Sequence, residues 1–124
     1  MTRTATLALA ALAAATLAAA TPARADERGE RIFKAQCGSC HTMDAGKNRI
    51  GPSLAGIVGR KSGEVEGFKY SAANKGANIT WTPEVLDKYL VNPKEMIPGT
   101  TMTYVGLKNE QQRADVIAYL SAKR

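Results

Sequence analysis

Residues 37–41 read Cys37-Gly38-Ser39-Cys40-His41, and they hold both cysteines and the only histidine of this 124-residue chain. On a helix, positions three apart share a face, and the next position lies close to that face. Two thiols and an imidazole are therefore expected to converge on one small area. This spacing is the attachment signature of a c-type haem, in which the thiols add to two vinyl groups and the histidine binds the iron. The stretch predicts one covalent haem c.

Three other kinds of site use a Cys-x-x-Cys pair. A zinc site needs four ligands, and the sequence has no further Cys or His to complete the set. A thiol–disulfide redox site is common near a strand–helix unit, but no alternating strand–helix pattern surrounds residues 37–41. Neither that site nor a plain structural disulfide accounts for the adjacent histidine. The haem interpretation is therefore favoured, while the two disulfide interpretations stay open at this point.

The N-terminal stretch has the pattern of a secretory signal peptide. One positive charge, Arg3, precedes a run of Ala and Leu at residues 7–20, and residues 22–25 end in the small-x-small pattern that signal peptidase cleaves. We predict that residues 1–25 are removed and that residues 26–124 form one domain. A retained membrane anchor is the alternative, and it is disfavoured because alanine is only weakly apolar. The bacterial-looking signal predicts a periplasmic location.

Without residues 1–25 the chain is short and basic. Arg3 and Arg24 leave with the signal, so 15 basic residues face 11 acidic ones and the net charge is +4. A chain of 99 residues buries a small core, and a covalent haem would supply much of the missing apolar mass. Positive charge favours partners with acidic docking surfaces and salt-sensitive association. We expect no nucleic acid partner and a monomeric chain.

The hydrophobic pattern predicts an all-α fold with three main helices. We expect them over residues 27–36, from the Thr82-Pro83-Glu84 start to Asn92, and from the Asn109 cap onward. The glycine-rich segments 42–78 and 93–108 are expected to form loops, with a short helical turn near residues 71–74. Loops of this length are reasonable in a compact domain when they wrap a bulky ligand.

If His41 binds one face of the iron, the group on the opposite face still has to be identified. The sequence has no second histidine, which leaves Met, Lys, water or an open position. Met43 lies too close to His41 in sequence to reach the opposite face. Met102 follows a Pro98-Gly99 turn that can aim its side chain inward. Met96 follows the end of the second predicted helix, and we expect it to pack in the core.

A series of short motifs runs in order along residues 26–124. They are Gly29-x-x-Ile32-Phe33, Cys37-x-x-Cys40-His41-Thr42, Gly51-Pro52-x-Leu54, Gly59-Arg60-Lys61-x-Gly63, Gly67-Phe68-x-Tyr70-Ser71-x-Ala73-Asn74, Trp81, Tyr89-Leu90-x-Asn92-Pro93-Lys94, Ile97-Pro98-Gly99-Thr100-x-Met102 and Arg113-Ala114-Asp115-x-Ile117-Ala118-Tyr119-Leu120. Together they resemble the class I cytochromes c, and within them the mitochondrial-like cytochromes c2 of bacteria. The resemblance implies a small cytochrome c fold with loops wrapped around one covalent haem.

The resemblance also implies roles for individual residues. Met102 resembles the axial methionine opposite His41, and Pro52 resembles the residue whose carbonyl accepts the other ring N–H of that histidine. Tyr89 resembles the hydroxyl that faces the methionine sulfur. The residues that resemble the surroundings of a buried haem propionate are Arg60, Tyr70, Asn74, Trp81 and Thr100. The first and last helices are implied to cross near Gly29, beside Phe33 and Tyr119.

A histidine–methionine pair fills both axial positions of the iron, so the resemblance implies a one-electron carrier and not an enzyme. It implies transfer from a bc1-type quinol:cytochrome c oxidoreductase to a photosynthetic reaction centre or a terminal oxidase, in photosynthesis or a respiratory chain. The candidates for a basic docking face are Arg31, Arg49, Lys94 and Lys108. Neutral or acidic residues stand at other positions where lysine is frequent in the family, namely Gln36, Glu95, Thr101 and Asn109.

Two other function classes stay open. One is a haem sensor or peroxidase-like enzyme in which Met102 leaves the iron readily. The other is a thiol–disulfide oxidoreductase that uses Cys37 and Cys40.

Overall fold

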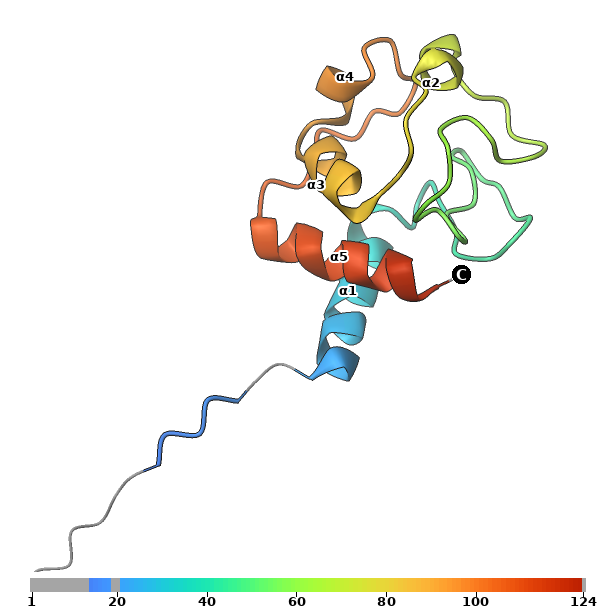
Figure 1. Cartoon of the computed structure of the whole chain (residues 1–124). Helices are drawn as coiled ribbons and strands as arrows, with labels where there is room; N and C mark the ends of the chain where they lie inside the picture. The colour runs from blue at the N-terminus through green and yellow to red at the C-terminus, as the bar shows by residue number, and fades with distance from the viewer. Residues whose placement is uncertain (1–13, 19–20, 124) are drawn as a thin grey trace, which may run out of the picture.

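The computed structural model describes residues 14–18 and 21–123, and the regular elements in these ranges are helices (Figure 1). In chain order they are α1 (Pro22–Gln36), α2 (Ala72–Gly76), α3 (Pro83–Val91), α4 (Pro93–Met96) and α5 (Glu110–Ala122). Extended pairing over the described residues is limited to one isolated antiparallel bridge between Lys61 and Thr80. The predicted all-α fold with three main helices is confirmed.

Helix α1 begins earlier than the sequence pattern predicts. Its start is at Pro22 rather than near Asp26, with Thr21 as an N-cap that makes no side-chain bond. Proline suits the first turn because its missing N–H is not needed there, and the alanines that follow favour helix. Helix α1 therefore continues across the predicted cleavage site after Ala25.

Most of the predicted signal peptide lies outside the described residues, because residues 1–13 and 19–20 are not described. Over the part of the chain that is described, no helix is both long enough and apolar enough to span a bilayer.

Helices α3 and α5 begin at the caps that the sequence predicts. The Thr82 hydroxyl accepts a hydrogen bond from the Val85 N–H over 3.2 Å, and Asn109 Oδ1 accepts one from the Gln112 N–H over 2.9 Å. The expectation that the chain returns to a loop at Pro93 is wrong, because residues from Pro93 onward form α4. A proline can end one helix and open the next, since it donates no hydrogen bond but suits a first turn.

Helices α1 and α5 cross at Gly29, as the resemblance implies (Figure 1). A side chain at Gly29 would collide with the backbone carbonyl of Asp115 and would lie 2.6 Å from Tyr119 Cβ, so only glycine permits this approach. Phe33 packs on Tyr119 with ring centroids 5.6 Å apart. The Arg28 guanidinium binds the Asp115 carboxylate through two hydrogen bonds of 2.9 and 3.1 Å. This crossing holds the end of α1, and with it residues 37–41, against the rest of the domain.

The core lies between the α1–α5 crossing and α3. Its buried apolar side chains come from all three main helices and from the loops between them, and they are Phe33, Ile57, Trp81, Leu86, Tyr89, Leu90, Ile97, Leu107, Val116, Ile117, Tyr119 and Leu120. Half-buried Cys37, Met96 and Met102 pack against this cluster. One predicted attachment residue, Cys37, and the candidate ligand Met102 therefore border the core.

Candidate haem site

The Cys37–His41 motif forms a turn directly after α1, which ends at Gln36, rather than part of the helix. The backbone N–H groups of Cys40 and His41 both donate to the Cys37 carbonyl, over 3.1 and 2.9 Å. The backbone therefore keeps a helix-like spacing through the motif, which is the spacing that the prediction of a shared attachment area requires. Both cysteines are free and half-buried. Burial, together with the neighbouring Cys40, raises the pKa of the Cys37 thiol to about 11.

A thiol with a raised pKa is a poor fit for disulfide exchange. Reactive cysteines in redox enzymes have depressed pKa values, because the thiolate is the attacking species. The surroundings of Cys37 act in the opposite direction. Among the described residues, no three Cys, His, Asp or Glu side chains gather into a metal-binding group, which also leaves zinc without a ligand set.

The His41 ring is oriented by the carbonyl of Pro52. The two atoms, His41 Nδ1 and Pro52 O, lie 2.8 Å apart. A carbonyl can only accept, so Nδ1 carries the proton and donates it, and Nε2 keeps its lone pair for a metal. Burial lowers the pKa of His41, which favours the neutral imidazole that binds metals, while the Pro52 contact opposes this shift.

Gly51 provides the space that this arrangement needs. A Cβ at this position would collide with the His41 ring. The backbone next to Pro52 can approach the imidazole closely only because Gly51 has no side chain.

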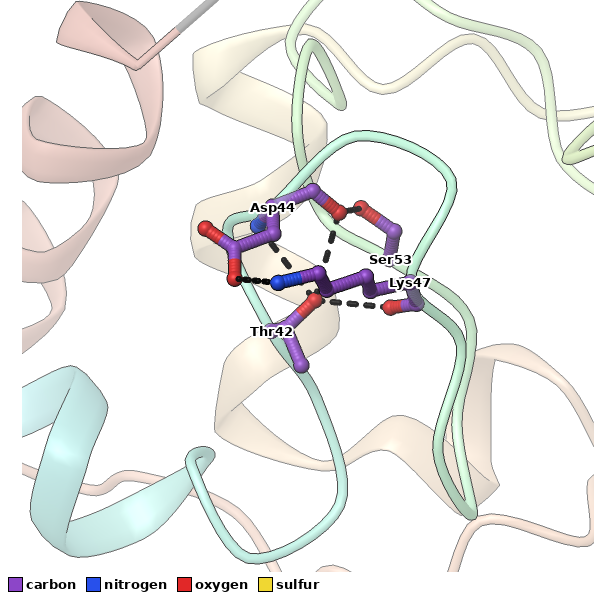
Figure 2. A network of polar contacts seen from close by, with 4 residues as sticks. All are labelled: Thr42, Asp44, Lys47 and Ser53. Atoms are coloured by element: carbon purple, nitrogen blue, oxygen red, sulfur yellow. Dashed lines mark hydrogen bonds and ion pairs between the residues drawn. The ribbon is translucent and has the colours of Figure 1, made fainter.

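A network of polar contacts folds the loop that returns from His41 to Pro52 (Figure 2). The Thr42 hydroxyl donates to the Lys47 carbonyl over 2.7 Å, and the buried Ser53 hydroxyl donates to the Asp44 carbonyl over 2.7 Å. Asp44 also forms an exposed ion pair with the Lys47 ammonium at 3.3 Å. These contacts hold Ser53, the residue that follows Pro52. They thereby fix the position at which the Pro52 carbonyl meets His41.

Met102 lies beside Tyr89 at the edge of the core. The Tyr89 hydroxyl donates a hydrogen bond to Met102 Sδ over 3.3 Å. Burial raises the pKa of Tyr89 to about 12, so this hydroxyl stays protonated at neutral pH. The Trp81 ring packs on Tyr89 with centroids 4.7 Å apart. Met96 also packs against the core, and it lines an outer pocket next to Lys88.

The remaining residues implied for the cofactor surroundings have separate partners in the protein. The Arg60 guanidinium donates to the carbonyls of Ala55 and Ser53 over 3.0 and 3.1 Å. The Tyr70 hydroxyl accepts from the Val65 N–H over 3.0 Å. Burial lowers the pKa of Arg60, and nearby Tyr70 opposes that shift.

The side chains of Asn74 and Thr100 differ in whether their oxygen atoms have hydrogen-bond partners. The Thr100 hydroxyl accepts from the Met102 N–H over 3.3 Å. The Asn74 N–H binds the Ser71 hydroxyl, whereas its buried side-chain oxygen, Oδ1, has no hydrogen-bond partner in the part of the chain described. A buried polar atom without a partner is costly, so it points to a bound group that the protein alone does not supply.

Two long-range contacts were not predicted from the sequence. Arg113 is 8% exposed and binds Asp87, although no role was expected for it. Its position three residues before buried Val116, on the apolar stripe of α5, was a signal that it is buried. The Tyr104 hydroxyl donates to Gln36 Oε1 over 3.1 Å, across 68 positions of sequence, and no local pattern indicates that pair.

The described residues fit a covalently attached haem. They offer two free half-buried thiols one turn apart, a neutral imidazole with one committed nitrogen, a thioether at the core edge and an unsatisfied buried amide oxygen. The family model for cytochrome c matches residues 27–123. The chain belongs to the cytochrome c family.

Several cytochromes c are similar to this chain over most of their length. Cytochrome c 2.1 of Caenorhabditis elegans is 47% identical over 82% of this chain and 92% of its own. Cytochrome c of Trypanosoma brucei brucei is 58% identical over 67% of this chain and 89% of its own. Among solved structures, cytochrome cH from Methylobacterium extorquens is 39% identical with a TM-score of 0.73, covering 79% of this chain and 98% of that one.

Membership in this family has two direct consequences. The chain binds one haem c covalently, and its two cysteines are available for the attachment. Proteins of the family carry electrons to and from membrane redox complexes, so the broad function predicted from the sequence is confirmed.

The predicted periplasmic location is wrong. The similar curated proteins are cytochromes c of eukaryotes, including nematodes, plants and a trypanosome, and eukaryotic cells have no periplasm. The N-terminal pattern of Ala and Leu led to that prediction, and such a pattern reports composition and not a compartment.

Proposed function

We propose that this cytochrome c carries single electrons with His41 and Met102 as the axial ligands of its haem iron, and with Cys37 and Cys40 as the attachment residues. The observation that carries the proposal is the Tyr89 hydrogen bond to Met102 Sδ, which holds a thioether sulfur at the edge of the core. When bound, the haem supplies an iron that alternates between ferric and ferrous. A thioether ligand favours the ferrous state and raises the reduction potential.

The protein residues keep that site closed to other chemistry. The Pro52 carbonyl fixes the tautomer of His41, so Nε2 would be the nitrogen available to hold the haem iron. Two protein ligands leave no open position for oxygen or peroxide, which supports a carrier and not an enzyme. The unsatisfied Asn74 Oδ1 supports a polar contact with the cofactor, and we propose Arg60, Tyr70, Trp81 and Thr100 as further residues of the haem pocket.

Absorption spectroscopy of the purified holoprotein tests the ligand assignment. We expect a sharp low-spin spectrum in the reduced protein and the sulfur-to-iron band in the ferric protein. Met102→Ala should lose that band, and Met96→Ala is the matched control that should keep it. Carbon monoxide binding to the unsubstituted ferrous protein without unfolding would contradict the proposal, because it would show that Met102 leaves readily.

For the redox partners, we propose a bc1-type quinol:cytochrome c oxidoreductase as donor and a terminal oxidase or photosynthetic reaction centre as acceptor. Exposed Arg31 and Lys94 support a basic docking face. Two other candidates also contact the backbone, since Arg49 binds the Gly38 carbonyl and Lys108 binds the Val91 carbonyl. Because Gln36, Glu95, Thr101 and Asn109 stand where lysine is frequent in the family, we expect electron-transfer rates that fall gently with ionic strength.

Stopped-flow reduction by a bc1-type complex, and oxidation by purified oxidase and by flash-activated reaction centres, test these partners. Rates that are slow with every complex would overturn the assignment. A steep fall of the electron-transfer rate with ionic strength would overturn only the expectation of weak salt dependence.

We also propose that residues 1–25 are a cleaved signal peptide and that the mature domain is 26–124. Cleavage would remove the first turn of α1 and leave acidic Asp26 at the new N-terminus, where it complements the helix dipole. N-terminal sequencing of the haem-loaded protein tests this proposal. A sequence beginning at Met1 or Thr2 would overturn it.

A further inference from the structure

The segment between α4 and α5, residues 97–109, carries Met102 and is called the Met102 loop here. It runs from α4 toward α2 and returns past α3 to the start of α5 (Figure 1). A Cβ on Gly99 would lie 3.4 Å from Ala73 Cβ of α2, which places the turn of the loop against that helix. The Met102 loop therefore extends from α4 to α2 before it returns to α5 (Figure 1).

The first half of the Met102 loop is held by its own turn. Ile97 is 2% exposed, and its carbonyl accepts from the Thr100 N–H over 3.1 Å. The Met102 N–H then donates to the Thr100 hydroxyl over 3.3 Å. Beyond Met102, residues 103–106 donate no backbone–backbone hydrogen bond within the described part of the chain. The next backbone contact is the Leu107 N–H to the Leu90 carbonyl of α3, at 2.7 Å.

Arg113 holds the loop at this second point. Its Nη1 donates to the carbonyls of Leu107 and Lys108 over 3.1 and 3.0 Å, and its Nε donates to Asp87 Oδ1 over 2.7 Å. A buried guanidinium needs acceptors for its N–H groups, and these three atoms supply them. The side chain of Arg113 thus joins α5, the end of the Met102 loop and α3.

Asp87 lies two residues before Tyr89 on α3, and Tyr89 contacts Met102 Sδ. The Asp87–Arg113 ion pair therefore connects α3, whose Tyr89 contacts the Met102 sulfur, with the end of the Met102 loop at Leu107 and Lys108. We propose that this ion pair positions Met102 and sets how readily the Met102 loop opens to release the sulfur from the iron. This inference rests on the proposed His41 and Met102 ligation.

Imidazole binding to the ferric holoprotein measures loop opening, because an added ligand can reach the iron only when Met102 leaves. Asp87 is half-exposed, so Asp87→Ala should leave the fold intact, whereas Arg113→Ala risks unfolding. We expect Asp87→Ala to bind imidazole about threefold to tenfold more tightly, since the ion pair stabilises only the closed state. Asp87→Glu keeps the carboxylate and should return the affinity toward that of the unsubstituted protein.

Asp115→Ala is the matched control. It removes a carboxylate of α5, the helix that also carries Arg113, and this carboxylate pairs with Arg28 of α1 and not with a residue of the Met102 loop. We expect it to lower the free energy of unfolding in urea but to change imidazole affinity by less than about twofold. Unchanged affinity in Asp87→Ala would overturn the inference. Imidazole affinities that change in proportion to the free energy of unfolding in both variants would also overturn it. The Asp87–Arg113 pair would then act only through global stability.

The same titration separates this inference from the proposed function. Absence of the ferric sulfur-to-iron band in the unsubstituted protein would overturn the Met102 ligation and this inference with it. A band that is present and is displaced by imidazole equally in all variants would overturn this inference alone.

Discussion

The hydroxyl of Tyr89 donates a hydrogen bond to Met102 Sδ over 3.3 Å, joining α3 to a loop 13 positions further along the chain. Tyr89 is buried, and its raised pKa of about 12 keeps the hydroxyl a donor throughout the neutral range. With Met102 as the iron ligand, as proposed, a donor at the sulfur would draw electron density away from the metal. The contact would then favour the electron-rich ferrous state.

Tyr89→Phe should lower the reduction potential by about 20–40 mV. This corresponds to a loss of about twofold to fivefold in preference for ferrous iron, at about 59 mV per tenfold change for one electron. Equilibrium potentiometry measures the change. Tyr119→Phe is the control, because Tyr119 is also buried but packs on Phe33 at the α1–α5 crossing. An unchanged potential in Tyr89→Phe, with the ferric sulfur band intact, would contradict the prediction.

Gly51→Ala should disturb the histidine side of the haem. The added Cβ would overlap the His41 ring, so the imidazole would have to move away from the Pro52 carbonyl. We expect a loss of about 2–3 kcal/mol in stability and less haem per mole of purified protein. Urea unfolding and haem absorbance measure the two effects. Gly76→Ala is the matched control, since a Cβ there meets nothing within 4 Å. Equal haem content in both variants would count against the role of Gly51.

Ser53→Ala should loosen the loop that delivers Pro52 to His41. Ser53 is 3% exposed, and its hydroxyl donates to the Asp44 carbonyl at 2.7 Å (Figure 2). The same hydroxyl accepts from the Ala55 N–H at 3.2 Å. Its loss should cost about 1–3 kcal/mol, because it leaves two backbone groups without this partner.

Lys47→Ala in the same network removes only an exposed ion pair, so it should change stability by less than about 0.5 kcal/mol. Thermal unfolding of both variants gives the comparison. Similar losses would mean that the network acts through its charges and not through the buried hydroxyl.

Asp115→Asn should remove a pH-dependent part of the stability. The hydrogen bond from Arg28 holds the pKa of the Asp115 carboxyl below its ordinary value of 3.8, with burial opposing and Gln111 assisting. A lowered pKa in the folded state means that the carboxylate stabilises the fold fully above about pH 4. This contribution is lost as the pH falls through the pKa of the folded state.

Urea unfolding at pH 7 and at pH 2 tests the sign. The variant should be less stable by about 1–2 kcal/mol at pH 7, and the difference should shrink in acid. Glu30→Gln serves as the control, since its ion pair with Lys34 is largely exposed. A difference that is the same at both pH values would contradict the assignment.

Local patterns in the sequence were sufficient to predict the three main helices. The caps at Thr82 and Asn109 lie within three residues of the N–H groups they bind, so short-range chemistry decides where α3 and α5 begin. Short-range contacts also shape residues 37–41, where the Cys40 and His41 N–H groups both donate to the Cys37 carbonyl. The start of α1 at Pro22 and the existence of α4 were not predicted, because proline can open a helix as well as end one.

By itself, the sequence determined which residues could bind the haem, because the Cys-x-x-Cys-His spacing and the ordered motifs are properties of the linear chain. Only the tertiary structure decided how those residues are held. His41 meets Pro52 across 11 positions, and Arg113 meets Asp87 across 26. Such pairs form because packing of the core brings distant segments together, and the resulting burial makes each unpaired polar group costly. No local pattern carries that information.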